Sequence, residues 1–177
     1  MSVKQKFLQF RLALLRKASN QRKISYFRKQ GVRIGENCFI NTVAFSTEPY
    51  LIEIGNHVAI AGGTEFLIHD GAIWCLREEI ENADVFGRIK IGNNVFIGNN
   101  CIILPNTVIG DNSVIGAGSV VRGQFPENSV IIGNPAKTVM SMSMQKLLYT
   151  QNPGFLKIKN LSDAEKKKVI KKHFNLE

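Results

Sequence analysis

The sequence has few of the residues that would mark a secreted, zinc-binding or membrane-spanning protein. Its 177 residues include three cysteines, Cys38, Cys75 and Cys101, and no CxxC motif or Cys/His cluster. This odd number predicts free thiols in a reducing compartment rather than a disulfide framework, and no metal site is expected. There is no apolar run long enough for a transmembrane helix, and no small-residue cleavage site indicates a signal peptide. We therefore expect a cytoplasmic protein.

Acidic residues are absent from residues 1–30, which contain nine Lys or Arg. The net charge of +9 therefore arises in this segment, and the remainder of the chain is neutral. The interspersed Phe and Leu residues predict one or two basic amphipathic helices. Three roles fit them: a cap on the end of the folded core, contact with an anionic membrane surface, and nucleic-acid binding. No nucleic-acid partner is expected, because the rest of the chain offers no basic groove or aromatic platform.

The most informative feature that is present is a repeat of six residues. An aliphatic residue occupies every sixth position from Ile91 to Val121, and the second position of each hexad is usually Gly. This period fits neither a lone helix nor an alternating strand, but it suits a chain that winds around a three-sided prism. The aliphatic residue then points inward, the small fifth residue lies near a corner, and Gly, Asn and Asp form the turns. Three hexads make one coil, so Ile91 should stack on Ile109 and Ile97 on Ile115 as parallel neighbours.

The repeat also occurs upstream, in pieces. Ile34 and Ile40 lie six residues apart, and Cys38 and Ala44 take the small position of their hexads. Ile54, Ile60 and Phe66 continue the pattern, with Val58 and Thr64 at the small positions. The step of twenty residues from Ile34 to Ile54 predicts a two-residue bulge near Thr47–Pro49. Between Phe66 and Ile91 the register breaks, which predicts an excursion over residues 70–88.

The chain is expected to have three parts. A basic helical segment covers residues 1–30, the prism covers residues 31–140, and a helical extension covers residues 141–177. Within the extension, Ser162 and Glu165 predict a capping box at the start of a helix that runs to Phe174.

Several runs resemble the hexapeptide-repeat acyltransferases, within the branch of maltose, galactoside, nodulation-factor and polysaccharide O-acetyltransferases. They are residues 91–98, Leu104-Pro105, residues 109–121 and the Gly-Asn-Pro-Ala-Lys sequence at 133–137. The resemblance covers residues 31–140 and implies a left-handed parallel β-helix. It also implies a homotrimer with active sites between subunits, acetyl-CoA as donor and a sugar hydroxyl as acceptor.

Acetyl transfer to a hydroxyl needs a base, and the sequence offers three histidines. His57 falls at an outward turn of a coil and His173 in the charged C-terminal helix, whereas His69 lies where the register breaks. The family has its catalytic histidine just before such an excursion, so His69 is the predicted general base. Imidazole suits the role because its unperturbed pKa is about 6.5. Asp70, Glu65 or a backbone carbonyl could orient it.

The remaining site residues divide between the two substrates. Asp70 and Trp74 are the predicted acceptor contacts, because a loop beside the base can hold a sugar against an aromatic ring; Trp74 could equally pack against a neighbouring subunit. A backbone N–H near Gly98–Asn99 is a candidate oxyanion donor. The resemblance implies five acetyl-CoA contacts, in which Phe96 stands where tryptophan is common and Arg122 where the family often has Thr-Lys. These five are Phe96, Asn99, Ala117, Arg122 and Lys137.

The sequence therefore favours an acetyl-CoA-dependent O-acetyltransferase of cell-envelope glycans, acting in the cytoplasm or at the inner face of the membrane. Alternatives on the same fold are N-acetylation of a nucleotide-linked amino sugar and acetylation of a xenobiotic. A γ-class carbonic anhydrase would need three zinc-binding histidines, and the spacing of His57, His69 and His173 does not provide them. A non-catalytic β-solenoid would show ranks of one repeated outward residue, but the outward positions vary.

Overall fold

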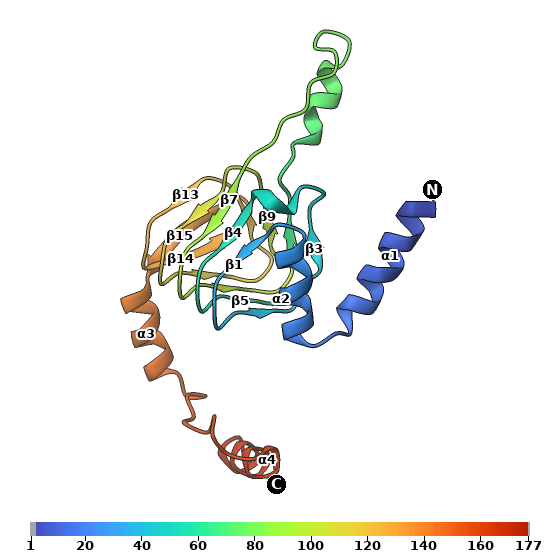
Figure 1. Cartoon of the computed structure of the whole chain (residues 1–177). Coiled ribbons are helices and arrows are strands. Elements are labelled where there is room, and N and C mark those ends of the chain that lie inside the picture. Colours follow the sequence, from blue (N-terminus) through green and yellow to red (C-terminus); the bar gives the residue numbers. More distant parts are fainter. Residues whose placement is uncertain (1–2, 177) are drawn as a thin grey trace. The chain divides into compact units, whose positions relative to one another are not determined.

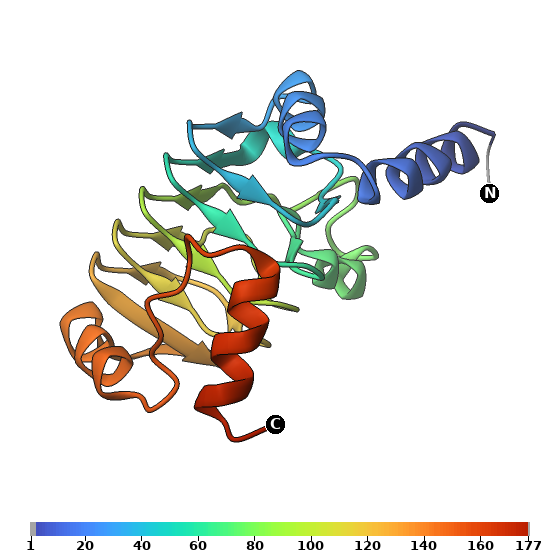
Figure 2. The ribbon, with the colours of Figure 1, turned by 90° about the horizontal axis from the view of Figure 1, so that it is seen from below.

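The computed structural model describes residues 3–176 and divides into two compact units, Met1–Gln145 and Lys146–Glu177. The first unit is a parallel β-solenoid with three flat sides, and two helices precede it (Figures 1 and 2). Apart from the hairpin of the last two strands, neighbouring strands within each sheet are three strands apart in the chain, as a repeat of three hexads per coil requires. The predicted prism is therefore confirmed, whereas the left hand of the coil stays a prediction.

Each side of the prism is one sheet, in which every pair of strands is parallel except β14 with β15. The first sheet contains β1 (Arg33–Ile34), β4 (Ile52–Ile54), β7 (Ile89–Ile91), β10 (Val108–Ile109) and β13 (Gln124–Phe125). The second contains β2 (Phe39–Ile40), β5 (Ala59–Ile60), β8 (Phe96–Ile97), β11 (Val114–Ile115), β14 (Ser129–Gly133) and β15 (Ala136–Ser141). The third contains β3 (Ala44–Phe45), β6 (Glu65–Phe66), β9 (Ile102–Ile103) and β12 (Val120–Val121).

The core is a set of aliphatic columns that run along the prism. Ile91 pairs with Ile109 and Ile97 with Ile115, as the period predicts, and all four side chains are buried. The small residues of the fifth position are buried beside them, and their hydroxyl and thiol groups bond to backbone carbonyls; Thr64, for example, donates to the Gly98 carbonyl over 2.8 Å. The repeat therefore satisfies its buried polar groups within the coils.

The glycines and asparagines of the repeat have different tasks. The positive φ angles at the corners belong mainly to asparagines of the fourth position, such as Asn94 at 53° and Asn112 at 54°. The second-position Gly55 has no such angle, but a Cβ there would lie 2.6 Å from the Gly92 carbonyl oxygen in the next coil. Close stacking of coils, rather than the turn itself, therefore requires glycine at that position.

The irregular first coil differs from the prediction in detail. Ile34 and Ile54 pair, so the step of twenty residues is correct, but Phe45 pairs with Phe66 over a step of twenty-one. The coil therefore omits one residue at the corner before β3 and adds three after it, where the 3₁₀ helix η1 (Pro49–Leu51) forms. As a result Val43, which is buried, takes the small position that was predicted for Ala44.

Helix α2 (Asn20–Lys29) closes the open end of the first coil, which confirms the capping role for this part of residues 1–30. It buries Ile24 and Phe27 against the core. The Phe27 ring lies 4.1 Å from that of Phe45, which stacks at 5.0 Å on Phe66. Phe27, Phe45 and Phe66 thus form a column of rings that runs from the capping helix to the second coil. The apolar end of the prism is therefore covered.

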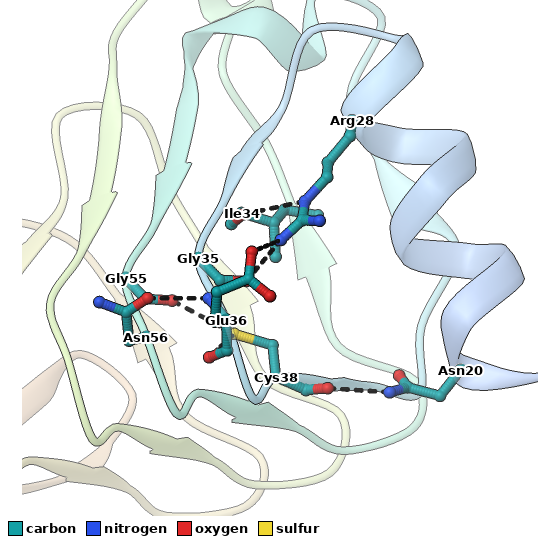
Figure 3. Close-up of polar contacts among 8 residues, drawn as sticks. All are labelled: Asn20, Arg28, Ile34, Gly35, Glu36, Cys38, Gly55 and Asn56. Atoms are coloured by element: carbon teal, nitrogen blue, oxygen red, sulfur yellow. Dashed lines mark hydrogen bonds and ion pairs between the residues drawn. The ribbon is translucent and has the colours of Figure 1, made fainter.

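Polar contacts at the rim complete this cap (Figure 3). Arg28 donates to the carbonyl oxygens of Ile34 at 3.0 Å and Gly35 at 2.8 Å. At the other end of the helix, the Asn20 amide donates to the Cys38 carbonyl at 2.8 Å. These bonds satisfy backbone groups that have no preceding coil to pair with.

The other helices flank the solenoid in the chain. Helix α1 (Val3–Arg16) precedes α2, whereas α3 (Met142–Gln151) and α4 (Asp163–His173) follow β15. The predicted capping box is confirmed: Glu165 accepts from the Ser162 backbone, and the Ser162 hydroxyl accepts from the Glu165 N–H. No helix within residues 3–176 has the length and apolar character needed to cross a membrane.

Candidate active site

The excursion leaves the prism between β6 and β7. His69 and Phe86 form an antiparallel bridge at its base, and the Asp70 N–H donates to the Val85 carbonyl at 2.8 Å. Beyond the bridge, the 3₁₀ helix η2 (Gly71–Leu76) forms the first half of a loop that projects from the coils (Figure 1). His69 thus lies where the two ends of the excursion come together, and the loop begins directly after it.

Asp70 fixes the start of this loop. Its carboxylate accepts from the Ala72 N–H at 3.1 Å and caps η2, and it pairs with Arg122 at 3.1 Å. The Ala72 hydrogen bond, and then the Arg122 hydrogen bond, lower the pKa of the Asp70 carboxyl from its ordinary value. Arg122 directly follows β12, so this pair joins the excursion to a coil fifty-two residues further along the chain.

A cavity of about 370 Å³ lies between the excursion and the chain that follows β3. His69, Asp70 and Trp74 all line it, so the structure brings the predicted base and both predicted acceptor contacts together. Trp74 is 78% exposed, which leaves its ring available to a ligand or a second subunit. The other lining residues are Thr47, Glu48, Gly71, Ile73, Arg77, Asp84, Val85 and Phe86.

The side chain in contact with the His69 ring is not among the candidates that the sequence left open, which were Asp70, Glu65 and a backbone carbonyl. Instead, His69 Nδ1 lies 3.4 Å from the Ser46 hydroxyl. Within residues 3–176, neither predicted carboxylate hydrogen-bonds to the ring, since Asp70 is held by Ala72 and Arg122, and Glu65 makes no such bond. Ser46 has no motif around it and lies twenty-three residues earlier, in the irregular first coil, so no sequence pattern predicts this contact.

Three of the predicted donor-binding residues lie along one corner of the prism. Ala117 stands one coil beyond Asn99, and the Gly118 N–H donates to the Asn99 carbonyl at 2.8 Å. Lys137 pairs with Ile132 in the β14–β15 hairpin, and Ile132 lies directly over Gly116. Asn99, Ala117 and the exposed Lys137 thus form a column along the edge of the second sheet, which we call the corner column.

Phe96 lies on the outer face of that same sheet, 48% exposed, and lines a groove of about 320 Å³ with Phe39 and His57. The Gly98 N–H, a candidate oxyanion donor, is already used within the coils, because it donates to the Ile115 carbonyl at 2.9 Å. That N–H is therefore not free to bind a ligand.

Arg122 does not lie on the corner column. It pairs with Asp70, which lines the cavity beside His69. The corner column and His69 flank opposite edges of the third sheet. One side of the prism, from Asn99 to Leu104, separates these edges, which is about 16 Å for an extended chain of this length. A single chain therefore presents the two predicted groups as separate surfaces.

The other two histidines have structural contacts. His57 sits at a corner with a φ of 55°, and its Nδ1 lies 2.8 Å from Asn94 Oδ1; the Asn94 amide in turn donates to Asn112. In the second unit, a ring nitrogen of His173 lies 2.7 Å from the Pro153 carbonyl. Across the part of the chain that the structure describes, no three His, Cys, Asp or Glu residues gather as they would around a metal ion.

Comparison with known proteins identifies the family. Residues 88–123 match the family model described as bacterial transferase hexapeptide (six repeats). Protein CapG of Staphylococcus aureus is 44% identical over 157 residues, a match that covers 87% of this chain and 90% of CapG. This chain belongs to the hexapeptide-repeat acyltransferases. The non-catalytic solenoid that the sequence left as an alternative is thereby set aside.

Solved structures agree with this acyltransferase fold. A hexapeptide-repeat acetyltransferase from Vibrio cholerae superposes with a TM-score of 0.61 at 24% identity, covering 80% of this chain and 94% of that one. A structure of such an acetyltransferase from Vibrio cholerae O1 biovar eltor, in complex with acetyl coenzyme A, has a TM-score of 0.55 at 31% identity. That match covers 63% of this acyltransferase and 60% of the other chain.

Proposed function

We propose that this acyltransferase transfers the acetyl group of acetyl-CoA to a sugar hydroxyl of a cell-envelope polysaccharide or its precursor. His69 is the general base, and the enzyme acts on the cytoplasmic side of the membrane. The observation that carries the proposal is the cavity at the break in the repeat, where a histidine, a carboxylate and an exposed tryptophan meet. Acetyl-CoA as co-substrate is supported by the 31% identical relative solved with acetyl coenzyme A.

The chemistry follows from the two ring nitrogens of His69. Ser46 Oγ lies 3.4 Å from Nδ1, which leaves Nε2 to accept the proton of the acceptor hydroxyl as its oxygen attacks the thioester carbonyl. The tetrahedral intermediate collapses with cleavage of the C–S bond. The imidazolium then returns its proton to the departing thiolate, which yields an acetyl ester and free CoA. The negative charge on the intermediate needs N–H donors at the carbonyl oxygen.

A homotrimer of left-handed coils is part of this proposal. The corner column and His69 flank opposite edges of one side of the prism, about 16 Å apart. If the corner column of one subunit faces the His69 cavity of the next, the thioester and the base meet between chains. Phe96 and Lys137 would then hold the pantetheine arm and the phosphates of the donor, since Lys is a natural partner of phosphate.

The proposal is tested by thiol release from acetyl-CoA in the presence of free sugars, nucleotide-linked sugars and amines. We expect release with a hydroxyl acceptor and a product that loses its acetyl group in mild base, as esters do. A base-resistant product formed only with amines would instead establish N-acetylation. Absence of release with every acceptor class, together with no binding of acetyl-CoA, would contradict the proposed donor as well.

A further inference from the structure

Helix α1 carries two apolar stripes, and only one of them packs against protein. Leu12 and Leu15 are half-buried against the core of the first unit. Phe7, Phe10 and Leu14 are 63%, 62% and 58% exposed. Their spacing of three and four residues places these three on one face of the helix. An exposed stripe of two phenylalanines and a leucine marks a surface that contacts something else.

Basic residues border this stripe on both sides. With about 100° per residue, Lys6 falls on one side of Phe7, Phe10 and Leu14 and Arg11 on the other, and Lys17 directly follows the helix. The Arg11 guanidinium lies 6.0 Å from the centroid of the Phe7 ring and 5.2 Å from that of Tyr26 on α2. No acidic residue occurs among residues 1–30. The stripe is therefore an apolar wedge with a positive rim.

We propose that α1 docks this stripe into the surface of an anionic lipid bilayer. Helices with an apolar face and a Lys/Arg-rich polar face lie in the plane of the membrane interface, where the apolar side chains enter the acyl boundary and the cations meet the headgroups. Leu12 and Leu15 meanwhile pack against the core of the first unit, so that docking of α1 holds the enzyme at the membrane.

The charge and the apolar character of the stripe favour an anionic bilayer over a second copy of this chain or a nucleic acid as its partner. Pairing the stripe with that of a second copy would bring two acid-free helices together, and their cations would repel. A nucleic acid would neutralise the cations but would leave Phe7, Phe10 and Leu14 in water. An anionic bilayer satisfies both the apolar stripe and its rim. The inference is independent of the acceptor, because membrane binding can be measured without any acetyl transfer.

Co-sedimentation of the full-length protein with vesicles tests the proposal. We expect binding to phosphatidylcholine vesicles that contain about one third phosphatidylglycerol, weaker binding to pure phosphatidylcholine, and release by salt as the charges are screened. Replacing Phe7, Phe10 and Leu14 together by Ser should lower the partition coefficient about tenfold or more, without changing thiol release from acetyl-CoA. Replacing Lys6 and Lys17 by Gln should weaken binding to anionic vesicles only.

The second unit supplies matched controls. Leu147 and Tyr149 on α3, and Phe174 at the end of the lysine-rich helix α4, are similarly exposed, at 48%, 52% and 52%. Their replacement by Ser should leave vesicle binding intact. The proposal is overturned if the wild-type protein does not bind anionic vesicles, or if the α1 variant binds as wild type does. Equal loss in the α1 variant and the control variant overturns it too. A lower oligomeric mass in the α1 variant with unchanged vesicle binding would assign the stripe to a second copy instead.

Discussion

The regular coils of residues 89–121 and the excursion of residues 70–88 use side chains in opposite ways. In the coils, each hexad buries an aliphatic residue in one of the columns and a small residue beside it, and the small residues from Cys101 onward bond to the backbone through their polar atoms. In the excursion nearly every side chain is exposed, and the loop is tied down by Asp70 and Arg77. The side chains of the coils therefore stabilise the fold, whereas most side chains of the excursion remain exposed and can contact a ligand.

The largest effect is expected on kcat, when His69 of the excursion site is replaced and compared with His57 of the coils. His69→Ala should lower kcat by a factor of about 10² to 10⁴, because a positioned base contributes that much to proton transfer. Its thermal stability should be nearly unchanged, since His69 is exposed. His57→Ala, which alters a corner of the coils, is the control and should keep its turnover. Steady-state thiol release measures both variants, and normal turnover of His69→Ala contradicts its role as base.

The next effect compares two glycines. A Cβ at Gly55 would lie 2.6 Å from a carbonyl oxygen of the next coil, whereas one at Gly71 in the excursion meets no atom within 4 Å. Gly55→Ala should therefore destabilise the protein by about 1–3 kcal/mol, as overpacking does, whereas Gly71→Ala should have almost no effect. Thermal unfolding followed by circular dichroism measures both. Equal midpoints of thermal unfolding for the two variants would show that the coils can move apart to accommodate a methyl group at Gly55.

A smaller effect concerns the two substrates. Lys137→Ala on the corner column should raise the KM for acetyl-CoA about tenfold while kcat changes little, because it removes ground-state binding to phosphate. Trp74→Ala in the excursion should show the reverse selectivity, with a raised KM for the acceptor only. Lys90→Ala, on the first sheet, is the control for lost charge. A change in the acceptor KM in Lys137→Ala would count against the assignment of the corner column to the donor.

The smallest effect is the pH dependence of the excursion. The pKa of Asp70 is lowered in the folded protein by the Ala72 and Arg122 contacts, so these contacts favour the folded loop above the ordinary pKa of Asp. This contribution disappears as the pH falls through the lowered pKa. Hydrogen-exchange protection of residues 71–76 should therefore decrease in acid, whereas Asp70→Ala, which removes both contacts, should have low protection at every pH. Unchanged protection in Asp70→Ala would mean that other contacts hold the loop.

Much of this architecture can be predicted from the sequence, because each hexad of the repeat makes the same contacts as the hexad one coil before it. The columns Ile91–Ile109 and Ile97–Ile115, the free cysteines and the Ser162–Glu165 capping box follow from period and local chemistry, and the structure confirms each. The first coil was harder to predict. Its one-residue deletion partly offsets its three-residue insertion, so the count from Ile34 to Ile54 shows only a net insertion of two residues.

The sequence by itself determined the prism, because each coil stacks on the one before it and the contacts between coils repeat with the period. It also singled out His69 as the place where that period fails. Only the tertiary structure decided what surrounds His69: Ser46 beside Nδ1, and Arg122 across from Asp70. These partners come from coils twenty-three residues before His69 and fifty-two residues after Asp70, and the irregular first coil and the excursion set their registers. Neither irregular segment has a period from which its geometry could be read.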